Sequence, residues 1–137
     1  MPPEIQAFAA GFPTTLAHAG ISLMLLALGA VTYAVLSPHR EIQEIRDGNA
    51  AAAVSYGGVL LGLAIPLAIS LAASTSLIEL ALWGAAITVV QLLVFRIADM
   101  VLKGLPQRVE EGEVSAAVLL VAARLACAVL LAAAVAG

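Results

Sequence analysis

Charged residues divide the chain into long apolar stretches separated by short polar ones. Apart from His18, no acidic or basic side chain occurs between Glu4 and His39, and none occurs from Asn49 to Ile78. A helix needs about 20 apolar residues to cross the hydrocarbon core of a bilayer. The pattern therefore predicts an all-α integral membrane protein with four spanning helices, over about residues 15–36, 50–72, 77–102 and 114–136.

Prolines and short polar runs mark the expected boundaries. We expect the first helix to start after Pro13 and to stop at Ser37-Pro38, because proline disfavours helix in the preceding residue. The polar run at 73–76 predicts a tight turn. Residues 1–15 contain one Glu and no Lys or Arg, so they lack the basic region of a signal peptide, and we expect the first apolar segment to be retained.

Composition supports this prediction and excludes several classes of function. Hydrophobic residues make up 63% of the 137 positions and charged residues 11%, and the mean hydropathy is +1.09. The six Lys and Arg are scattered, so nucleic acid is not an expected partner. The single cysteine, Cys127, forms no intramolecular disulfide and no metal framework. With no enzyme motif in the chain, we expect neither catalysis nor a cofactor.

The positive residues predict an orientation, because Lys and Arg near the ends of spans favour the cytoplasmic side. Arg40 and Arg46 lie in the first loop, and Lys103 and Arg108 lie in the third, with Arg96 close by. The N-terminal tail, the middle turn and the C-terminal end carry none. Loops one and three should therefore be cytoplasmic, and both termini should face outward.

An internal repeat of two helical hairpins is the strongest organisational signal. Displacing the chain by 64 residues aligns units of about 16–73 and 80–137 without a gap. The displacement superposes two short matching motifs, each an acidic residue followed by glycine, which we call steps. They precede the second and fourth spans and are Asp47, Gly48 and Asn49 in the first unit and Glu111 and Gly112 in the second. Since each unit holds two spans, both copies keep one orientation and form parallel repeats.

Among the polar residues of the spans, Arg124 has the largest expected free-energy cost of being placed in the membrane. It lies near the middle of the fourth span, where a charge costs at least about 2.5–3.5 kcal/mol. Counting depth along antiparallel helices brings it level with Gln91, its expected hydrogen-bond partner, and with Leu61 and Gly62, whereas no carboxylate shares its depth. A helix-bridging or snorkelling arginine and a pore or ligand role are equally compatible with this position.

Two further polar pairs are candidates. Arg96 and Asp99 are three residues apart on one helix face, so a structural ion pair near the interface is favoured. His18 and Glu79 lie at similar depth toward the outer side, where they could relay a proton. A simple polar contact of the histidine is the favoured alternative.

Small and polar residues recur every three or four positions along the second span and share one face. They are Ser55, Gly58, Gly62, Pro66 and Ser70. Small residues allow close approach of helices in lipid, so tight helix packing is the favoured interpretation. Pro66 would also free a backbone carbonyl, and such interrupted helices can line ion or substrate sites.

The chain resembles a known family at two stretches, HREIQEIRDGNAAAAVSYGGVLLGLAIPLA and PQRVEEGEVSAAVLLVAARLA. Both look like the domain of unknown function 350 family of small bacterial inner-membrane proteins, and the resemblance covers nearly all of the chain. It implies a four-helix membrane protein built from two repeated hairpins and brings no catalytic residues. The second step departs from the family pattern, because Glu113 stands where the family usually has Asn.

Two functions follow as hypotheses. Abundant packing signals beside little chemistry favour a non-enzymatic, self-associating structural or accessory component of the bacterial envelope, with lipid, further copies or other membrane proteins as partners. The alternative is an oligomeric channel or transporter for small ions, in which Arg124 would favour anions.

Overall fold

The computed structural model describes residues 1–137, and all of its regular structure is helical. Four helices are long and apolar enough to span a membrane, and two short helices occupy the first and third loops. The spanning helices are α1 (Pro3–Leu36), α3 (Ala50–Ala73), α4 (Leu77–Val101) and α6 (Val114–Ala136), and the short ones are α2 (Glu41–Arg46) and α5 (Leu105–Glu110). The predicted all-α fold with four spans is confirmed.

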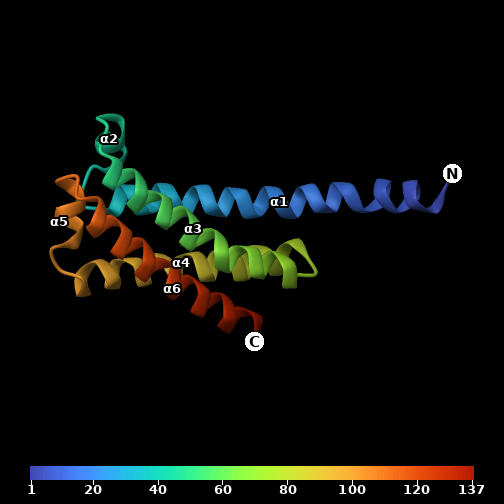
Figure 1. Cartoon of the computed structure of the whole chain (residues 1–137). Coiled ribbons are helices and arrows are strands. Elements are labelled where there is room, and N and C mark those ends of the chain that lie inside the picture. Colours follow the sequence, from blue (N-terminus) through green and yellow to red (C-terminus); the bar gives the residue numbers. More distant parts are fainter.

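The spanning helices pack around the pair formed by α3 and α6, which run in the same direction and make the most extensive contact in the molecule. Helices α1 and α4 run in the opposite direction (Figure 1). Both short helices lie at one end of the bundle, which we call the α2–α5 end. The turn between α3 and α4 lies at the other end, toward which the two termini point.

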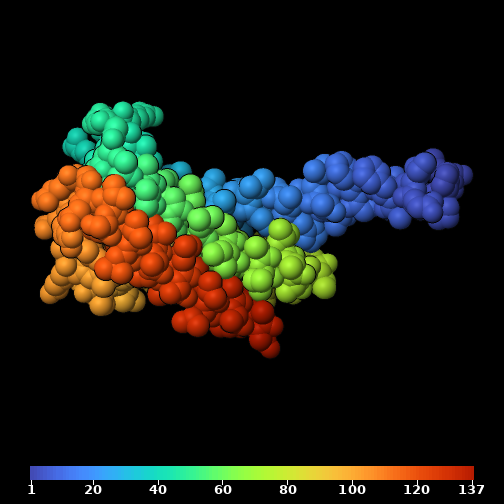
Figure 2. Space-filling model, viewed as in Figure 1, coloured from blue at the N-terminus to red at the C-terminus, as the bar shows by residue number.

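Helix α1 begins at Pro3, so the predicted start near residue 15 is wrong. Pro13 lies inside the helix, where it removes one backbone N–H. The residues around it are rich in alanine, which has the best helix propensity, and spanning helices tolerate internal proline. The N-terminal part of α1 therefore continues as helix and projects beyond the other spans (Figure 2).

The backbone repeats at the 64-residue displacement seen in the sequence. Helices α5 and α6 begin 64 residues after α2 and α3, respectively. The short helix of each unit is followed, two residues after its end, by a glycine with left-handed backbone, Gly48 (φ 92°) in one unit and Gly112 (φ 91°) in the other. The amides of Asn49 and Glu113 then return to the carbonyls of Glu44 and Arg108, as in a Schellman motif. The acidic-glycine step of the sequence is thus a helix C-cap that turns the chain into the next span.

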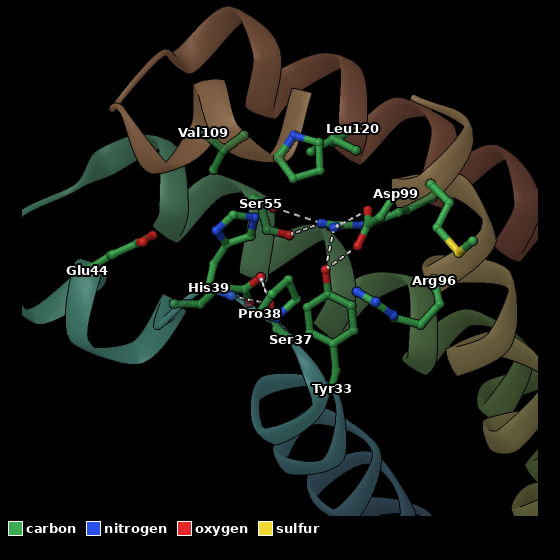
Figure 3. A pocket seen from close by; sticks show the side chains of 14 residues that line it. Tyr33, Ser37, Pro38, His39, Glu44, Ser55, Arg96, Asp99, Val109 and Leu120 are labelled. Carbon is green, nitrogen blue, oxygen red and sulfur yellow. Dashed lines mark hydrogen bonds and ion pairs between the residues drawn. The ribbon is translucent and has the colours of Figure 1, made fainter. Parts of the chain in front are cut away.

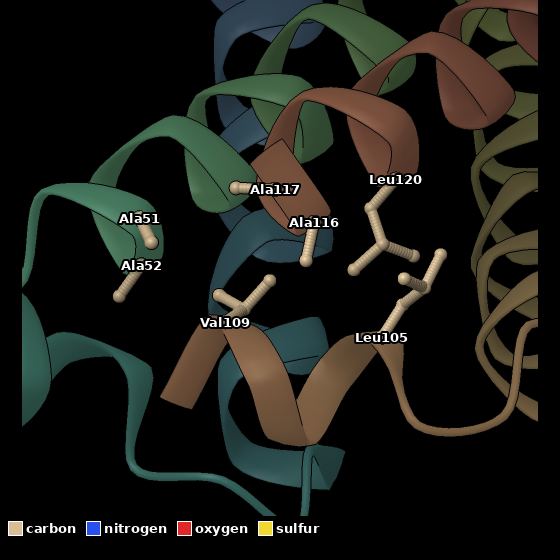
Figure 4. Close-up of a cluster of buried hydrophobic side chains, with 7 residues drawn as sticks. All are labelled: Ala51, Ala52, Leu105, Val109, Ala116, Ala117 and Leu120. Atoms are coloured by element: carbon tan, nitrogen blue, oxygen red, sulfur yellow. The ribbon is translucent and has the colours of Figure 1, made fainter. Parts of the chain in front are cut away.

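Close packing joins the two units along the α3–α6 contact. The five small residues predicted to share a face all lie on the buried side of α3. At the α2–α5 end, α5 packs beneath the first turns of α3 and α6 in a cluster of buried apolar side chains (Figure 4). That cluster consists of Ala51, Ala52, Leu105, Val109, Ala116, Ala117 and Leu120.

Gly58 sets how closely α3 and α6 approach. A Cβ atom added there would lie 2.6 Å from Cγ2 of Val121 and 3.2 Å from the Val121 backbone Cα. Contacts this short with backbone require the helices to separate, because well-packed interiors have no free volume to absorb them. Gly57, the preceding residue, has open space where its Cβ would stand.

We predict that Gly58→Ala lowers the free energy of unfolding in mixed detergent micelles by about 1–3 kcal/mol, the usual cost of overpacking. Gly57→Ala is the matched control. It should be neutral or stabilising by up to about 1 kcal/mol, because alanine has the higher helix propensity. Equal stability of the two variants would show that α3 and α6 do not cross at Gly58.

Candidate functional site

Polar side chains from the other three spanning helices surround Arg124 of α6 and form a network with it (Figure 3). Nη1 of Arg124 donates to the carbonyl and to the hydroxyl of Ser55 on α3, each at 2.8 Å. Nη2 donates to the Tyr33 hydroxyl on α1 at 2.6 Å and to Oδ1 of Asp99 on α4 at 3.0 Å. Tyr33 in turn donates to Oδ2 of Asp99 at 3.0 Å. Arg124 thus meets its opposite charge inside the protein, and only its Nε has no partner.

Aromatic rings enclose the guanidinium and shield it from lipid. The Arg124 side chain is 1% exposed, and its Cζ lies 5.3 Å from the ring centroid of Tyr33 and 5.8 Å from that of Phe95. The two rings meet edge to face with centroids 6.0 Å apart. Both cation-π attraction and the ion pair are stronger where water is excluded. The network therefore fixes the positions of all four spans around one buried charge.

The expected pairing of Arg124 with Gln91 is wrong, as is the expectation that no carboxylate is within its reach. Side chains of a helix slope toward its N-terminus, and an arginine side chain is long, so the guanidinium lies nearer the α2–α5 end than its own Cα. It consequently reaches Ser55, which lies six residues before Leu61 on α3. There it also meets Asp99.

Gln91 instead forms a hydrogen bond with the backbone of α3. Pro66 has no N–H, so the carbonyl of Gly62, four residues earlier, loses its usual helical partner. Nε2 of Gln91 donates to that carbonyl at 2.9 Å. The amide of α4 thus satisfies the group that the proline of α3 leaves free, and it is fully buried in doing so.

The expected pair of Arg96 with Asp99 does not form. Asp99 points into the bundle, where it accepts from Arg124 and Tyr33. Arg96 is half-buried and lies by a cavity at the α2–α5 end. The carboxylate therefore goes to the more deeply buried arginine, for which an unpaired charge would cost more.

His18 and Glu79 are not brought together either. Nδ1 of His18 lies 2.8 Å from the carbonyl of Thr14 in the preceding turn of its own helix. The carboxylate of Glu79 accepts from the backbone N–H and the hydroxyl of Thr75, so it helps to form the turn before α4. No hydrogen bond connects the two, and the relay loses its geometric basis.

The repeated steps differ in what their last residue does. Asn49 caps α3 by accepting from the Ala52 amide at 3.1 Å, and its Nδ2 donates to the carbonyls of Val109 and Glu110 in the other unit. Glu113, its counterpart, pairs with Arg108 in its own loop. The connection between the units at these steps is therefore made by Asn49 and not by Glu113.

Beside the network, a cavity of about 200 Å³ lies at the α2–α5 end, with Arg124 and Asp99 in its wall. Glu41 also lines it and is only 7% exposed. Burial raises the pKa of Glu41 to about 7, although the Arg124 guanidinium and a hydrogen bond from Ser37 oppose the rise. The sequence does not single out Glu41, because it lies in a charged loop where a glutamate is expected to be exposed to water.

The fold and the network define a class: a multi-pass, all-helical membrane protein whose four spans are joined by a buried ion pair. A family model, Domain of Unknown Function (DUF350), matches residues 7–135, and the chain belongs to this family. The chain is 30% identical over 107 residues to the UPF0719 inner membrane protein YjfL of Escherichia coli K12, which covers 78% of this chain and 80% of the relative. The YjfL protein of strain O157:H7 matches equally. No solved structure matches.

Together with the four apolar helices, these relatives support a location in the inner membrane. The predicted family and membrane class are confirmed. Neither the family description nor the name of the relative states an activity.

We predict that Arg124→Leu lowers the free energy of unfolding in mixed detergent micelles by about 3–5 kcal/mol, because it leaves Asp99 buried without a counter-charge. Replacing both partners, as Arg124→Leu with Asp99→Leu, should restore a substantial part of this loss. Arg96→Leu is the matched control on the same cavity and should change stability little. A double variant no more stable than Arg124→Leu alone would contradict the ion pair.

Proposed function

We propose that the protein is a non-enzymatic structural or accessory component of the bacterial inner membrane that associates with further copies of itself. One observation carries this proposal: both terminal nitrogens of the Arg124 guanidinium are bound by the chain's own helices. Arg124 binds groups of α1, α3 and α4, so the polar side chains at this level hold spans together. Groups that already satisfy one another leave little with which to bind or transform a substrate.

Self-association is supported by the surface that α1 presents outside the bundle. In their most apolar stretches α1 and α6 are each 22% buried, compared with 44% for α3, and α1 differs from α6 in the segment that projects beyond the other spans. Large apolar side chains cover its outer side, including Leu23, Met24, Leu28, Val31 and Val35. The helix has 34 residues, so it is about 51 Å long against a hydrocarbon core of about 30 Å. Its projecting segment and its outer face are available to a second copy.

The test is disulfide crosslinking in native membranes, in a Cys127→Ala background that removes the only native thiol. We expect Leu28→Cys on the outer side of α1 to yield covalent dimers on mild oxidation. Leu130→Cys on the outer side of α6, which is also exposed, is the matched control and should yield fewer. Monomer alone from α1 positions at every oxidant level would contradict self-association.

A second candidate, an oligomeric channel or transporter, is favoured by the cavity that reaches Arg124 from the α2–α5 end. The anion preference of this alternative is weakened, because Asp99 neutralises the arginine. Liposomes that hold the crosslinkable protein separate the two functions. Chloride leakage equal to that of empty liposomes supports the structural role, whereas faster leakage that Arg124→Leu abolishes would support transport.

We further propose that the α2–α5 end faces the cytoplasm and both termini face outward, from the position of Arg and Lys near the ends of the spans. In the same cysteine-free background, Gln107→Cys in α5 and Ser76→Cys in the α3–α4 turn provide exposed thiols at opposite ends. A membrane-impermeant thiol reagent added to spheroplasts should label Ser76→Cys and spare Gln107→Cys until the cells are lysed. The reverse pattern would invert the proposed orientation.

A further inference from the structure

Three potential metal ligands from two loops converge at the α2–α5 end. They are His39, in the connection between α1 and α2, Glu44 on α2, and Glu110 at the end of α5. Nδ1 of His39 lies 2.7 Å from a carboxylate oxygen of Glu110. One ligand atom from each of the three lies within 4.8 Å of the other two. In Figure 3 the carboxylate of Glu44 points toward the His39 ring.

The charges of this cluster favour a cation. A carboxylate oxygen of Glu44 lies within 4.8 Å of one of Glu110, so the two negative charges face each other at short range. Two carboxylates that repel each other beside one imidazole carry a net negative charge at neutral pH. A bound divalent cation would neutralise both carboxylates at once.

A separate observation in the cavity that His39 and Glu44 line points to a ligand. Glu41 lines the same cavity as His39 and Glu44, and its Oε2 is buried without a hydrogen-bond partner, whereas its Oε1 accepts from the Ser37 hydroxyl. A buried acceptor with no donor is costly. The cavity of about 200 Å³ is large enough for water, since one molecule needs only about 10–15 Å³ of such volume. A water molecule held by a cation at its mouth would supply the missing donor, as carboxylates around metal sites commonly require.

The donor set selects the class of cation. One imidazole nitrogen with two carboxylate oxygens and an open position for water suits a four-coordinate zinc-type ion. Mg²⁺ and Ca²⁺ prefer oxygen ligands alone. Bonds of about 2.1 Å in a tetrahedron place ligand atoms about 3.4 Å apart. Nδ1 of His39 and the Glu110 carboxylate oxygen, which are 2.7 Å apart, would separate to this spacing as the cation replaces the proton between them, and the 50% exposed Glu110 side chain has the freedom to move.

We propose that His39, Glu44 and Glu110 bind one divalent transition-metal cation of the zinc type at the mouth of this cavity, with Glu41 positioning a metal-bound water. The site connects α2 of the first unit to α5 of the second. It does not rest on the structural role proposed above, since a scaffold and a transporter could equally carry it.

The test is a calorimetric titration of the full chain, purified in detergent and stripped of metal by a chelator, with Zn²⁺ alone as the probe. We expect one Zn²⁺ per chain and a loss of affinity of at least about 10-fold in each of His39→Gln, Glu44→Gln and Glu110→Gln. Glu41→Gln should weaken binding by about 10–100-fold, the usual effect of losing an outer partner of a metal site. Mg²⁺ at equal concentration should not compete.

Two substitutions are matched controls, because they remove the same side-chain types outside the cluster. His18→Gln removes the other histidine, and Glu111→Gln removes the glutamate adjacent to Glu110. Both should bind Zn²⁺ as the parent does. Each variant is also compared by gel filtration, so that a loss of binding is counted only where the elution volume is unchanged.

Absence of a 1:1 Zn²⁺ event in the parent would overturn the proposal. Unchanged affinity in all three ligand variants would do the same. As a second readout, Co²⁺ bound to the parent should show visible absorption of a four-coordinate ion that His39→Gln abolishes. Six-coordinate Co²⁺ spectra in every variant would indicate adventitious surface binding and contradict the site.

Discussion

The ion pair between Arg124 and Asp99 is the interaction on which the rest of this structure depends. A charge inside a bilayer is costly unless it is paired and hydrogen-bonded, and both conditions require groups from other helices. Ser55 and Tyr33 complete the hydrogen bonds, so one residue of each span contributes. An apolar side chain gains little free energy by packing on another helix instead of on lipid. The polar groups of the network, by contrast, find hydrogen-bond partners only in one another. The network therefore selects one relative position of the four spans.

The same constraint explains the contact between Gln91 and the backbone of α3. Pro66 would leave the Gly62 carbonyl unsatisfied in a region without water, and the buried amide of Gln91 meets that need. Gly62 has no side chain, and an added Cβ would lie 2.6 Å from Phe95. The proline, the glycine and the glutamine are thus one arrangement, in which close approach of α3 and α4 allows the hydrogen bond. Phe95 also lies beside Arg124, so the same ring packs against the Arg124 network and against the bond between Gln91 and Gly62.

The parts of the structure that depend on local signals could be predicted from the sequence. Span length follows from the absence of charge, and the C-caps follow from Gly48 and Gly112. The partner of Arg124 could not be predicted by counting from helix ends, because a long side chain acts several residues from its own Cα. The cross-unit bonds of Asn49 depend on how the two loops pack, which no local pattern records. The predicted start of the first helix after Pro13 is wrong because tertiary context decides whether a proline ends a helix.

The two units share a backbone but not their polar residues, and this difference bears on how the repeat is used. At the displacement of 64 residues, the network residues Arg124, Asp99, Tyr33 and Ser55 correspond to Leu60, Val35, Ile97 and Leu119. All four counterparts are apolar and exposed on the outside of the bundle. A symmetric pair of units would bury two such networks, each needing its own counter-charge. A single network instead joins the two units in one relative position. The four counterpart residues remain apolar and therefore compatible with lipid.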